Sequence, residues 1–152
     1  MTHRIASNPI HWPQWVAALT IIAMVLAFTP GWAPAQEIIA NYGLPKTAIT
    51  RNEARLFFSM KLGIWPNGAP VQVYVLPDDH PLHREFCTQV LGLYPYQLRR
   101  VWDRQVFSGT GQSPVTISSE AELIERTAAS PGAVSYAATP PDNPRVRVLT
   151  VK

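Results

Sequence analysis

An apolar run near the start of the chain decides how much of it can form a folded domain. Residues 16–28 are almost entirely apolar, follow a segment with one arginine and two histidines, and precede TPGWAPA, which ends in small residues at Ala33 and Ala35. A membrane-spanning helix needs about 20 apolar residues, so this run is short for one, whereas two small residues separated by one position precede a signal-peptidase cut. We therefore expect residues 1–35 to be a secretory signal peptide, cleaved between Ala35 and Gln36.

The signal sequence also predicts where the protein resides. No twin-arginine pair precedes the apolar run, so we expect export of the unfolded chain to the periplasm by the general route. The alternative is an uncleaved signal that acts as an inner-membrane anchor, because Trp12 and Trp15 have the amphipathic rings found at membrane interfaces. We expect membrane association only in that second case.

The remaining 117 residues, 36–152, are enough for one compact domain and too few for two. They keep 12 of the chain's 13 lysines and arginines and all 10 acidic residues. The resulting net charge of +2 is scattered along the chain, which argues against a nucleic-acid partner. Cys87 is the single cysteine, so it cannot form an internal disulfide. We expect it to be buried as a small apolar side chain, with an intermolecular disulfide as the alternative.

Strand and helix patterns alternate along this part of the chain. Alternating apolar residues and turn residues predict strands over residues 37–42, 71–77, 132–137 and 146–151. Apolar residues at helical spacing between capping and stop signals predict helices over residues 54–62, 81–92, 95–107 and 120–129. This order predicts an α/β sandwich, a mixed sheet with flanking helices, in which residues 140–144 form a hairpin-like or crossover loop.

A glycine-rich stretch, FSGTGQSP at residues 107–114, has the composition of a phosphate-binding loop. It follows a predicted helix and does not begin one, so it lacks the helix dipole that phosphate loops use. Our first interpretation is a structural turn in which Gly109 or Gly111 takes a positive φ. The alternative is an anion nest formed by Ser108, Thr110 and Gly111.

A second stretch, DDHPLHRE at residues 78–85, combines carboxylate and imidazole side chains. Asp78, Asp79, His80 and His83 could together bind zinc or copper, since the two histidines are three residues apart on one helix turn. The simpler interpretation is that Asp78 or Asp79 caps the helix and that both histidines are exposed to solvent.

The chain contains little that predicts catalysis. Ser108, His83 and Asp79 are the only combination resembling a nucleophile with a base and an orienting carboxylate, and no G-x-S-x-G motif is present. We therefore expect no enzymatic activity and no cofactor. Arg99, Arg100 and Arg104 are expected to face outward as a solvated helix surface or, alternatively, to contact an anion or an acidic partner.

A succession of short motifs runs through residues 49–137. The motifs are I-T-x-x-E-x-x-x-x-F from residue 49, WPNGxPVxVYVLP from residue 65, REFCTQVLG from residue 84, Trp102, the FSG of residues 107–109, Pro114 and SPGAVSYA from residue 130. This succession resembles one lobe of the phosphate-type periplasmic solute-binding proteins. The resemblance implies an exported type II solute-binding domain. Such proteins close two lobes on an anion, here a small oxyanion such as phosphate, and deliver it to a transporter.

Two departures from the family pattern bear on function. The folded part has the length of one lobe, so the second wall of a ligand cleft would be missing or would come from another chain, for example in a homodimer. The family's Arg-x-Asp-x-Ser-Gly-Thr motif is replaced by VLPDDHPLHREF, in which Asp78 and Asp79 would repel an anion at the helix start. Three hypotheses follow: a solute-binding domain, an interaction or scaffold domain of the cell envelope that has lost its ligand, and a metal-binding protein.

Overall fold

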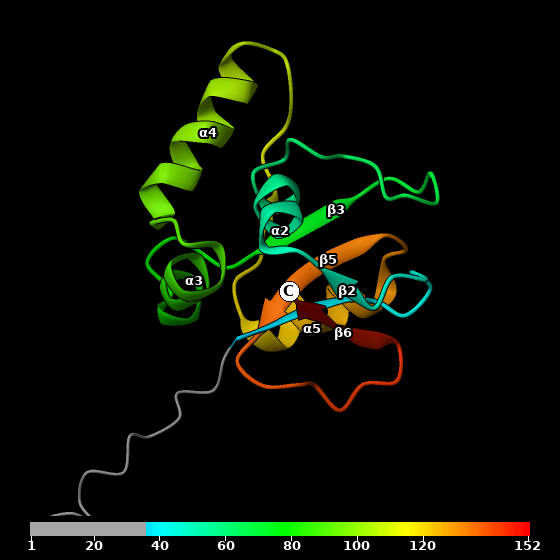
Figure 1. Ribbon diagram of the computed structural model, residues 1–152. Helices are drawn as coiled ribbons and strands as arrows, with labels where there is room; N and C mark the ends of the chain where they lie inside the picture. The colour runs from blue at the N-terminus through cyan, green and yellow to red at the C-terminus, as the bar shows by residue number, and fades with distance from the viewer. Residues whose placement is uncertain (1–35) are drawn as a thin grey trace, which may run out of the picture. The chain divides into compact units, whose positions relative to one another are not determined.

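The computed structural model describes residues 36–152, so the expected signal peptide and its cleavage site lie outside the described residues. Within the described range, none of the helices combines the length and the apolar character that a membrane crossing requires. The predicted fold class, α/β with a mixed sheet and flanking helices, is confirmed (Figure 1).

One six-stranded sheet organises the domain, with strand order β2-β6-β1-β5-β3-β4. The strands are β1 (Glu37–Asn41), β2 (Ala48–Ile49), β3 (Gln72–Val75), β4 (Val115–Thr116), β5 (Ala133–Ala137) and β6 (Val146–Val151). Strand β1 is antiparallel to both of its neighbours, β5 and β6, while the β2–β6, β3–β5 and β3–β4 pairs are parallel. All strands except β1 therefore run in one direction and end at the same side of the sheet.

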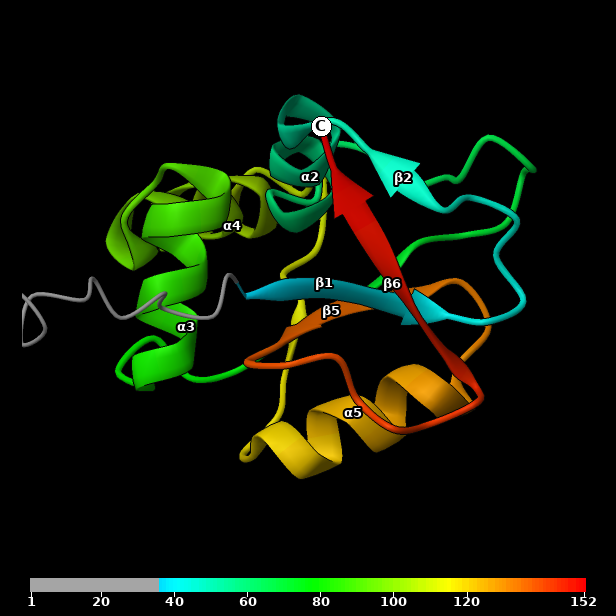
Figure 2. The same ribbon diagram turned by 60° about the horizontal axis from the view of Figure 1, so that its bottom comes forward.

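Helices cover both faces of the sheet (Figure 2). They are α2 (Arg51–Phe58), α3 (Pro81–Glu85), which continues as the π-helix η1 (Phe86–Leu91), α4 (Pro95–Phe107) and α5 (Glu120–Ala129). Successive residues of β5 point to opposite faces of the sheet. Ser135 hydrogen-bonds Thr127 of α5 on one face, and Tyr136 stacks on Phe86 of η1 on the other. All residues of the central strand β5 are buried, as expected for a strand covered on both sides.

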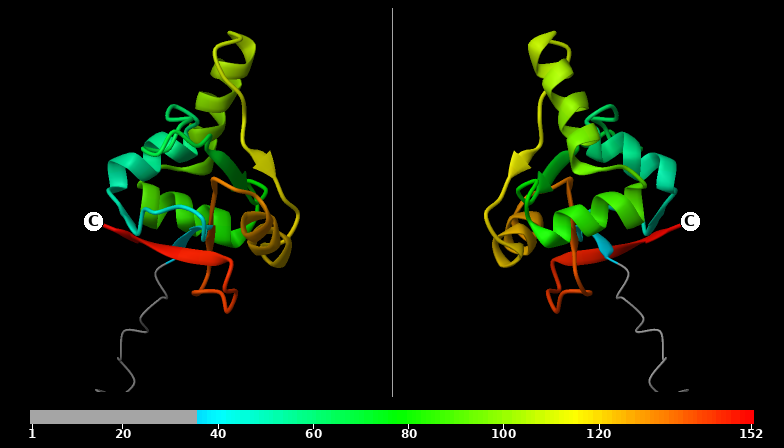
Figure 3. Two further views of the ribbon diagram at one scale, coloured as in Figure 1. Left: turned by 90° about the vertical axis from the view of Figure 1, so that its right-hand side faces the viewer. Right: turned by 90° about the vertical axis from the view of Figure 1, so that its left-hand side faces the viewer.

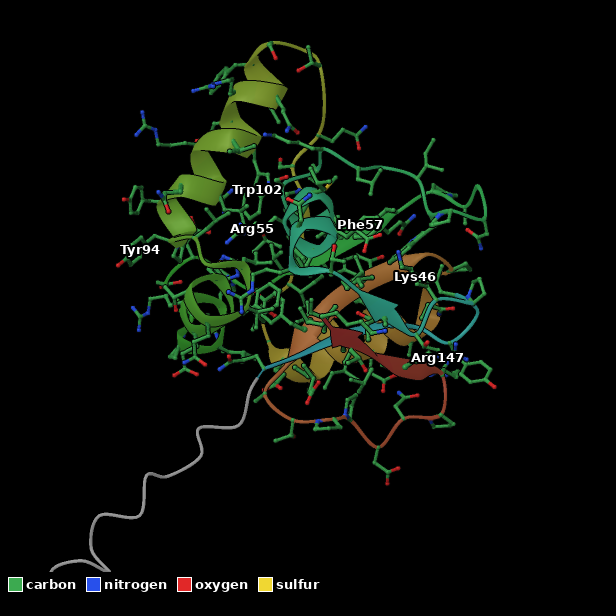
Figure 4. The ribbon with its side chains drawn as sticks, viewed as in Figure 1. Lys46, Arg55, Phe57, Tyr94, Trp102 and Arg147 are labelled. Carbon is green, nitrogen blue, oxygen red and sulfur yellow. The ribbon has the colours of Figure 1, made fainter. Side chains whose placement is uncertain are left out.

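Helix α4 is attached to the domain through two fully buried side chains, Leu98 and Trp102. Trp102 is fully buried, points from α4 toward α2 and donates from Nε1 to the Phe58 carbonyl oxygen at 2.9 Å (Figure 4). The C-terminal end of α4 projects away from the sheet before the chain returns to β4 (Figure 3). Phe107, at that end, is 89% exposed.

Most predicted elements agree with the structure, and three differences have physical reasons. The helix expected over residues 54–62 begins at Arg51 and ends at Phe58, because Met60 takes a left-handed φ of 58°. The predicted helix over residues 81–92 is α-helical only at its start and widens into η1, which Gly92 ends at φ 64°. Strands β2 and β4 were not predicted, because two residues are too few to show a period.

The loop over residues 140–144 belongs to a crossover, one of the two expected alternatives. Strands β5 and β6 are parallel to each other and separated by β1, so a hairpin cannot join them. The connection is bound to α5, whose Glu120 accepts from Ala138 N and whose Glu125 accepts from Asn143 Nδ2.

Candidate functional site

The candidate site is the side of the sheet at which the parallel strands end, which we call the carboxyl edge. Helix α2 follows β2, α3 follows β3 and α5 follows β4, so all three helices begin there. The antiparallel strand β1 begins there as well, next to the end of β6. Ligands of open α/β sheets bind outside the carboxyl ends of the strands, because loops and helix N-termini meet at that edge.

At the start of α3, the chain caps its own helix. His80 is the N-cap, and its Nδ1 accepts a hydrogen bond from Leu82 N at 3.2 Å, while Pro81 occupies the first helical position. The expectation that Asp78 or Asp79 would be the cap is wrong. Asp78 lies two residues before the cap, and its carboxylate contacts another helix.

That contact is a bidentate ion pair with Arg99 of α4. Arg99 donates from Nη2 to Asp78 Oδ1 at 2.8 Å and from Nε to Oδ2 at 3.0 Å. The hydrogen bonds to Asp78 raise the pKa of Arg99, and its guanidinium lies over the Trp102 ring at 4.9 Å from the centroid. Arg99 therefore does not belong to an outward arginine face, as the sequence suggested, whereas Arg100 and Arg104 are exposed.

His83 is fully buried, so the expectation of two solvent-exposed histidines is wrong. The Tyr136 hydroxyl accepts from Leu76 N at 2.8 Å and lies 2.6 Å from His83 Nδ1. On the other side of the ring, His83 Nε2 lies 3.5 Å from Cys87 Sγ and 3.8 Å from Asp78 Oδ1. Burial lowers the pKa of His83 to about 4 and is the main cause that raises the pKa of Cys87 to about 12.

These contacts determine what Cys87 and the expected metal ligands can do. Cys87 is buried, as expected, and its thiol stays protonated, so it is no nucleophile. Of the four candidate metal ligands, His80 caps α3, Asp78 pairs with Arg99 and His83 lies in the core, while Asp79 is exposed. Within residues 36–152, no group of three or more His, Cys, Asp or Glu side chains is arranged to hold a metal ion.

The glycine-rich loop lies at the projecting end of α4. The backbone N–H groups of residues 108–111 all donate to carbonyl oxygens of residues 104–106. The Ser108 hydroxyl contacts Arg104 O and Thr110 Oγ1. Gly109 takes φ 69°, which fits the structural-turn interpretation, and the engaged N–H groups leave Ser108, Thr110 and Gly111 no bare donors for an anion nest.

On the other side of the carboxyl edge is an open cavity of about 640 Å³. It lies between the start of β1, the end of β6, the start of α2 and the middle of η1. We call this region the α2 half of the carboxyl edge. The residues at the start of α3 and those they contact, Asp78, His80, His83, Arg99 and Tyr136, form the α3 half. The polar residues lining the cavity are Gln36, Glu37, Arg51, Gln89 and Thr150. Sequence reasoning missed this set, because its members are spread over four distant segments.

Comparisons with known proteins locate the fold but not its function. No protein-family model matches the chain, and no curated protein sequence matches it. Among solved structures, an ABC-type phosphate transport receptor from Vibrio cholerae aligns with a TM-score of 0.58 at 11% identity, over 79% of this chain and 48% of that one. A putative phosphate ABC transporter substrate-binding protein with bound phosphate from Clostridium perfringens aligns with a TM-score of 0.59 at 12% identity, over 77% and 44%.

PstS from Borrelia burgdorferi gives the same result, with a TM-score of 0.55 at 13% identity over 77% of this chain and 47% of that one. The described domain has the fold of one lobe of the phosphate-type solute-binding proteins. The chain spans about half the length of these solved proteins. The resemblance drawn from the sequence is thereby confirmed for the fold.

At the carboxyl edge of this lobe, the chain itself caps the start of each of the three helices. Thr50 and Glu53 form a complete capping box on α2, and Ser119 accepts from Glu122 N on α5. With His80 on α3, all three helix starts have a side-chain acceptor in the position that a bound anion would take. A ligand at this edge must therefore be recognised mainly by side chains.

Proposed function

We propose that the protein is an exported, one-lobe solute-binding domain whose ligand-bearing surface is the carboxyl edge. The observation that carries this proposal is the fold, which is that of one lobe of phosphate-transport binding proteins. The edge also has the general requirements of a solute site, since three helices begin there and a cavity of about 640 Å³ opens there. The export signal over residues 1–35 is part of the proposal and gives a periplasmic location.

The ligand class includes a small oxyanion such as phosphate, because one structural neighbour holds bound phosphate. Two features of this chain favour a different or more weakly held solute. Asp78 neutralises Arg99 near the start of α3, and Glu120 and Glu122 place negative charge in the first turn of α5. We infer that a transporter, another envelope protein or a second copy of the chain supplies the other wall of the cleft.

A thermal-shift titration tests this function. The full chain is expressed, and the mass of the purified protein shows whether residues 1–35 have been removed. Its melting temperature is then measured at increasing concentrations of phosphate, sulfate, zinc chloride and L-amino acids. A solute that binds only the folded protein raises the melting temperature in a dose-dependent way. We expect such a rise with at least one organic or anionic solute and none with zinc. No rise with any of them contradicts the solute-binding function.

A second candidate, a protein-interaction domain, is favoured by exposed aromatic side chains. Tyr94 and Tyr96 are 58% and 59% exposed and stack on each other with their ring centroids 5.8 Å apart, and Phe107 is also exposed. Large exposed aromatic residues are frequent anchors of protein interfaces. Light scattering discriminates the two candidates: a monomer that responds to no solute supports the interaction domain, and a solute-dependent change in melting temperature supports solute binding.

A further inference from the structure

We propose that the cavity in the α2 half of the carboxyl edge binds a small zwitterionic solute with an apolar side chain, of the α-amino acid class. This inference rests on the proposed solute-binding function and names the solute and its site. The cavity volume, about 640 Å³, lies in the range of small-molecule sites, which is about 300–1,000 Å³.

One cationic and one anionic side chain line this cavity without pairing. Arg51, the first residue of α2, is exposed, and Glu37, at the start of β1, is half-buried. Neither forms an ion pair with a described residue. The antiparallel pair Ile38–Leu149 places Glu37 next to Thr150, while Arg51 N donates to Lys152 O at 3.2 Å. Opposite charges are thus held by adjoining strand ends, which suits a ligand with a carboxylate and an ammonium group.

A third group provides an unused hydrogen-bond acceptor. Gln36 lines the cavity, is 6% exposed and donates from Nε2 to Glu85 Oε2 at 2.7 Å. Its Oε1 has no hydrogen-bond partner among the described residues. A buried acceptor without a donor is unfavourable, and a ligand ammonium group is a donor that would remove this cost.

The rest of the lining is apolar and selects for the ligand's side chain. Val90, Val148 and Val151 line the cavity together with the polar residues. An inorganic oxyanion would leave these side chains in water and would have to face Glu37. A zwitterion with a branched aliphatic side chain covers them and matches both charges, so the lining favours this class over phosphate.

The test is isothermal titration of the purified protein with L-leucine, L-valine, L-glutamine and glycine. The comparison compounds are 4-methylpentanoate, which lacks the ammonium group, isoamylamine, which lacks the carboxylate, and phosphate. We expect leucine or valine to bind best, and 4-methylpentanoate and isoamylamine each to bind at least about tenfold more weakly. Arg51→Gln and Glu37→Gln should each weaken leucine binding at least about tenfold, because each removes one charge-assisted hydrogen bond. Arg100→Gln, an exposed arginine on α4, is the matched control and should bind leucine as the native protein does.

The outcomes separate this inference from the function it rests on. If none of the four amino acids binds while phosphate does, the zwitterion site is wrong and the solute-binding function stands. If amino acids bind but Arg51→Gln and Glu37→Gln leave the affinity unchanged, the class is right and the assigned cavity is wrong, which also overturns the inference. If no compound binds at all, both proposals fail. Circular dichroism of each variant confirms that a lost response is not a loss of folding.

Discussion

The two halves of the carboxyl edge contain the same kinds of polar side chain but differ in what these side chains contact. In the α3 half, Asp78 and Arg99 bind each other with two hydrogen bonds, and His83 is buried against Tyr136. In the α2 half, Arg51 and Glu37 line an open cavity without an ion pair to any described residue. The first half satisfies its charges internally, and the second leaves them to solvent or a ligand.

Because of this difference, we expect the α3 half to contribute mainly to the stability of the fold and the α2 half mainly to ligand binding. Side chains that are fixed by buried partners position α3 and α4 on the sheet, and removing one leaves its partner unpaired. Side chains without such partners contribute little to folding and remain free to contact a solute. We therefore expect substitutions in the α3 half to change the free energy of unfolding, and substitutions in the α2 half to change ligand affinity with little effect on stability.

The largest expected effect is on stability and comes from Trp102→Ala. Trp102 is fully buried, donates to the Phe58 carbonyl and supports the Arg99 guanidinium. Its removal leaves a cavity between α4 and α2, so we expect a loss of about 3–5 kcal/mol in the free energy of unfolding, measured by urea denaturation. Tyr96→Ala, an exposed aromatic residue on the same helix, is the control and should stay within about 0.5 kcal/mol of the native protein. A loss below about 1 kcal/mol for Trp102→Ala would contradict the role of this side chain as a main attachment of α4.

The second prediction concerns the dependence of stability on pH in the α3 half. Burial lowers the pKa of His83 from 6.5 to about 4, against the attraction of Asp78, which raises it, while Arg99 and His80 lower it further. Between these two pH values the unfolded chain binds a proton at this residue and the folded chain does not, so stability decreases as pH falls. The contribution is fully present above pH 6.5 and is lost by about pH 4, with an upper limit of about 3 kcal/mol.

His83→Gln provides the comparison for this pH dependence. A glutamine can still accept from the Tyr136 hydroxyl but does not titrate. The difference in unfolding free energy between native protein and His83→Gln should therefore change between pH 6.5 and 4 and stay constant above pH 6.5. If the unfolding free energies of the two proteins changed in parallel over the whole pH range, His83 would have no lowered pKa, since the remaining titratable groups are the same in both proteins.

Local signals in the sequence were sufficient for much of the fold. The helices at residues 95–107 and 120–129 and the strand at residues 146–151 have the predicted bounds, because proline, capping residues and glycine or proline stops define their ends. Apolar residues at helical spacing predict a buried face through Leu82, Phe86 and Val90 for the helix at residues 81–92, but the buried face of α3 and η1 is wider. His83 is four residues before Cys87, and both lie on the buried side, which a wider face would have included.

The α2 half could not be predicted, for a reason that lies in the topology. Gln36 and Glu37, Arg51, Gln89, and the end of β6 come from four separate segments, and nothing in any single segment indicates a site. Only the sheet order, in which β1 lies between β5 and β6, brings them together. The Asp78–Arg99 pair likewise joins residues 21 positions apart through the packing of α4, which sequence spacing does not show.

The substitution with the smallest expected effect on stability is the most direct test of the comparison between the halves, because it breaks the internal ion pair of the α3 half. Asp78→Asn removes the carboxylate that binds Arg99 and leaves a guanidinium at the start of α3 without its partner. Both side chains are 37% exposed, so solvent screening limits the loss of stability to below about 1 kcal/mol. The freed guanidinium and the removed negative charge should together make sulfate and phosphate stabilise the variant at several-fold lower concentration than the native protein, in a thermal-shift titration.

The control is Asp79→Asn, which removes the same charge one residue away. Asp79 forms no ion pair among the described residues, so this substitution should leave the sulfate response nearly unchanged. Equal responses of the two variants would mean that net charge alone governs anion binding at this edge, and that the internal pairing of Asp78 with Arg99 does not distinguish the two halves.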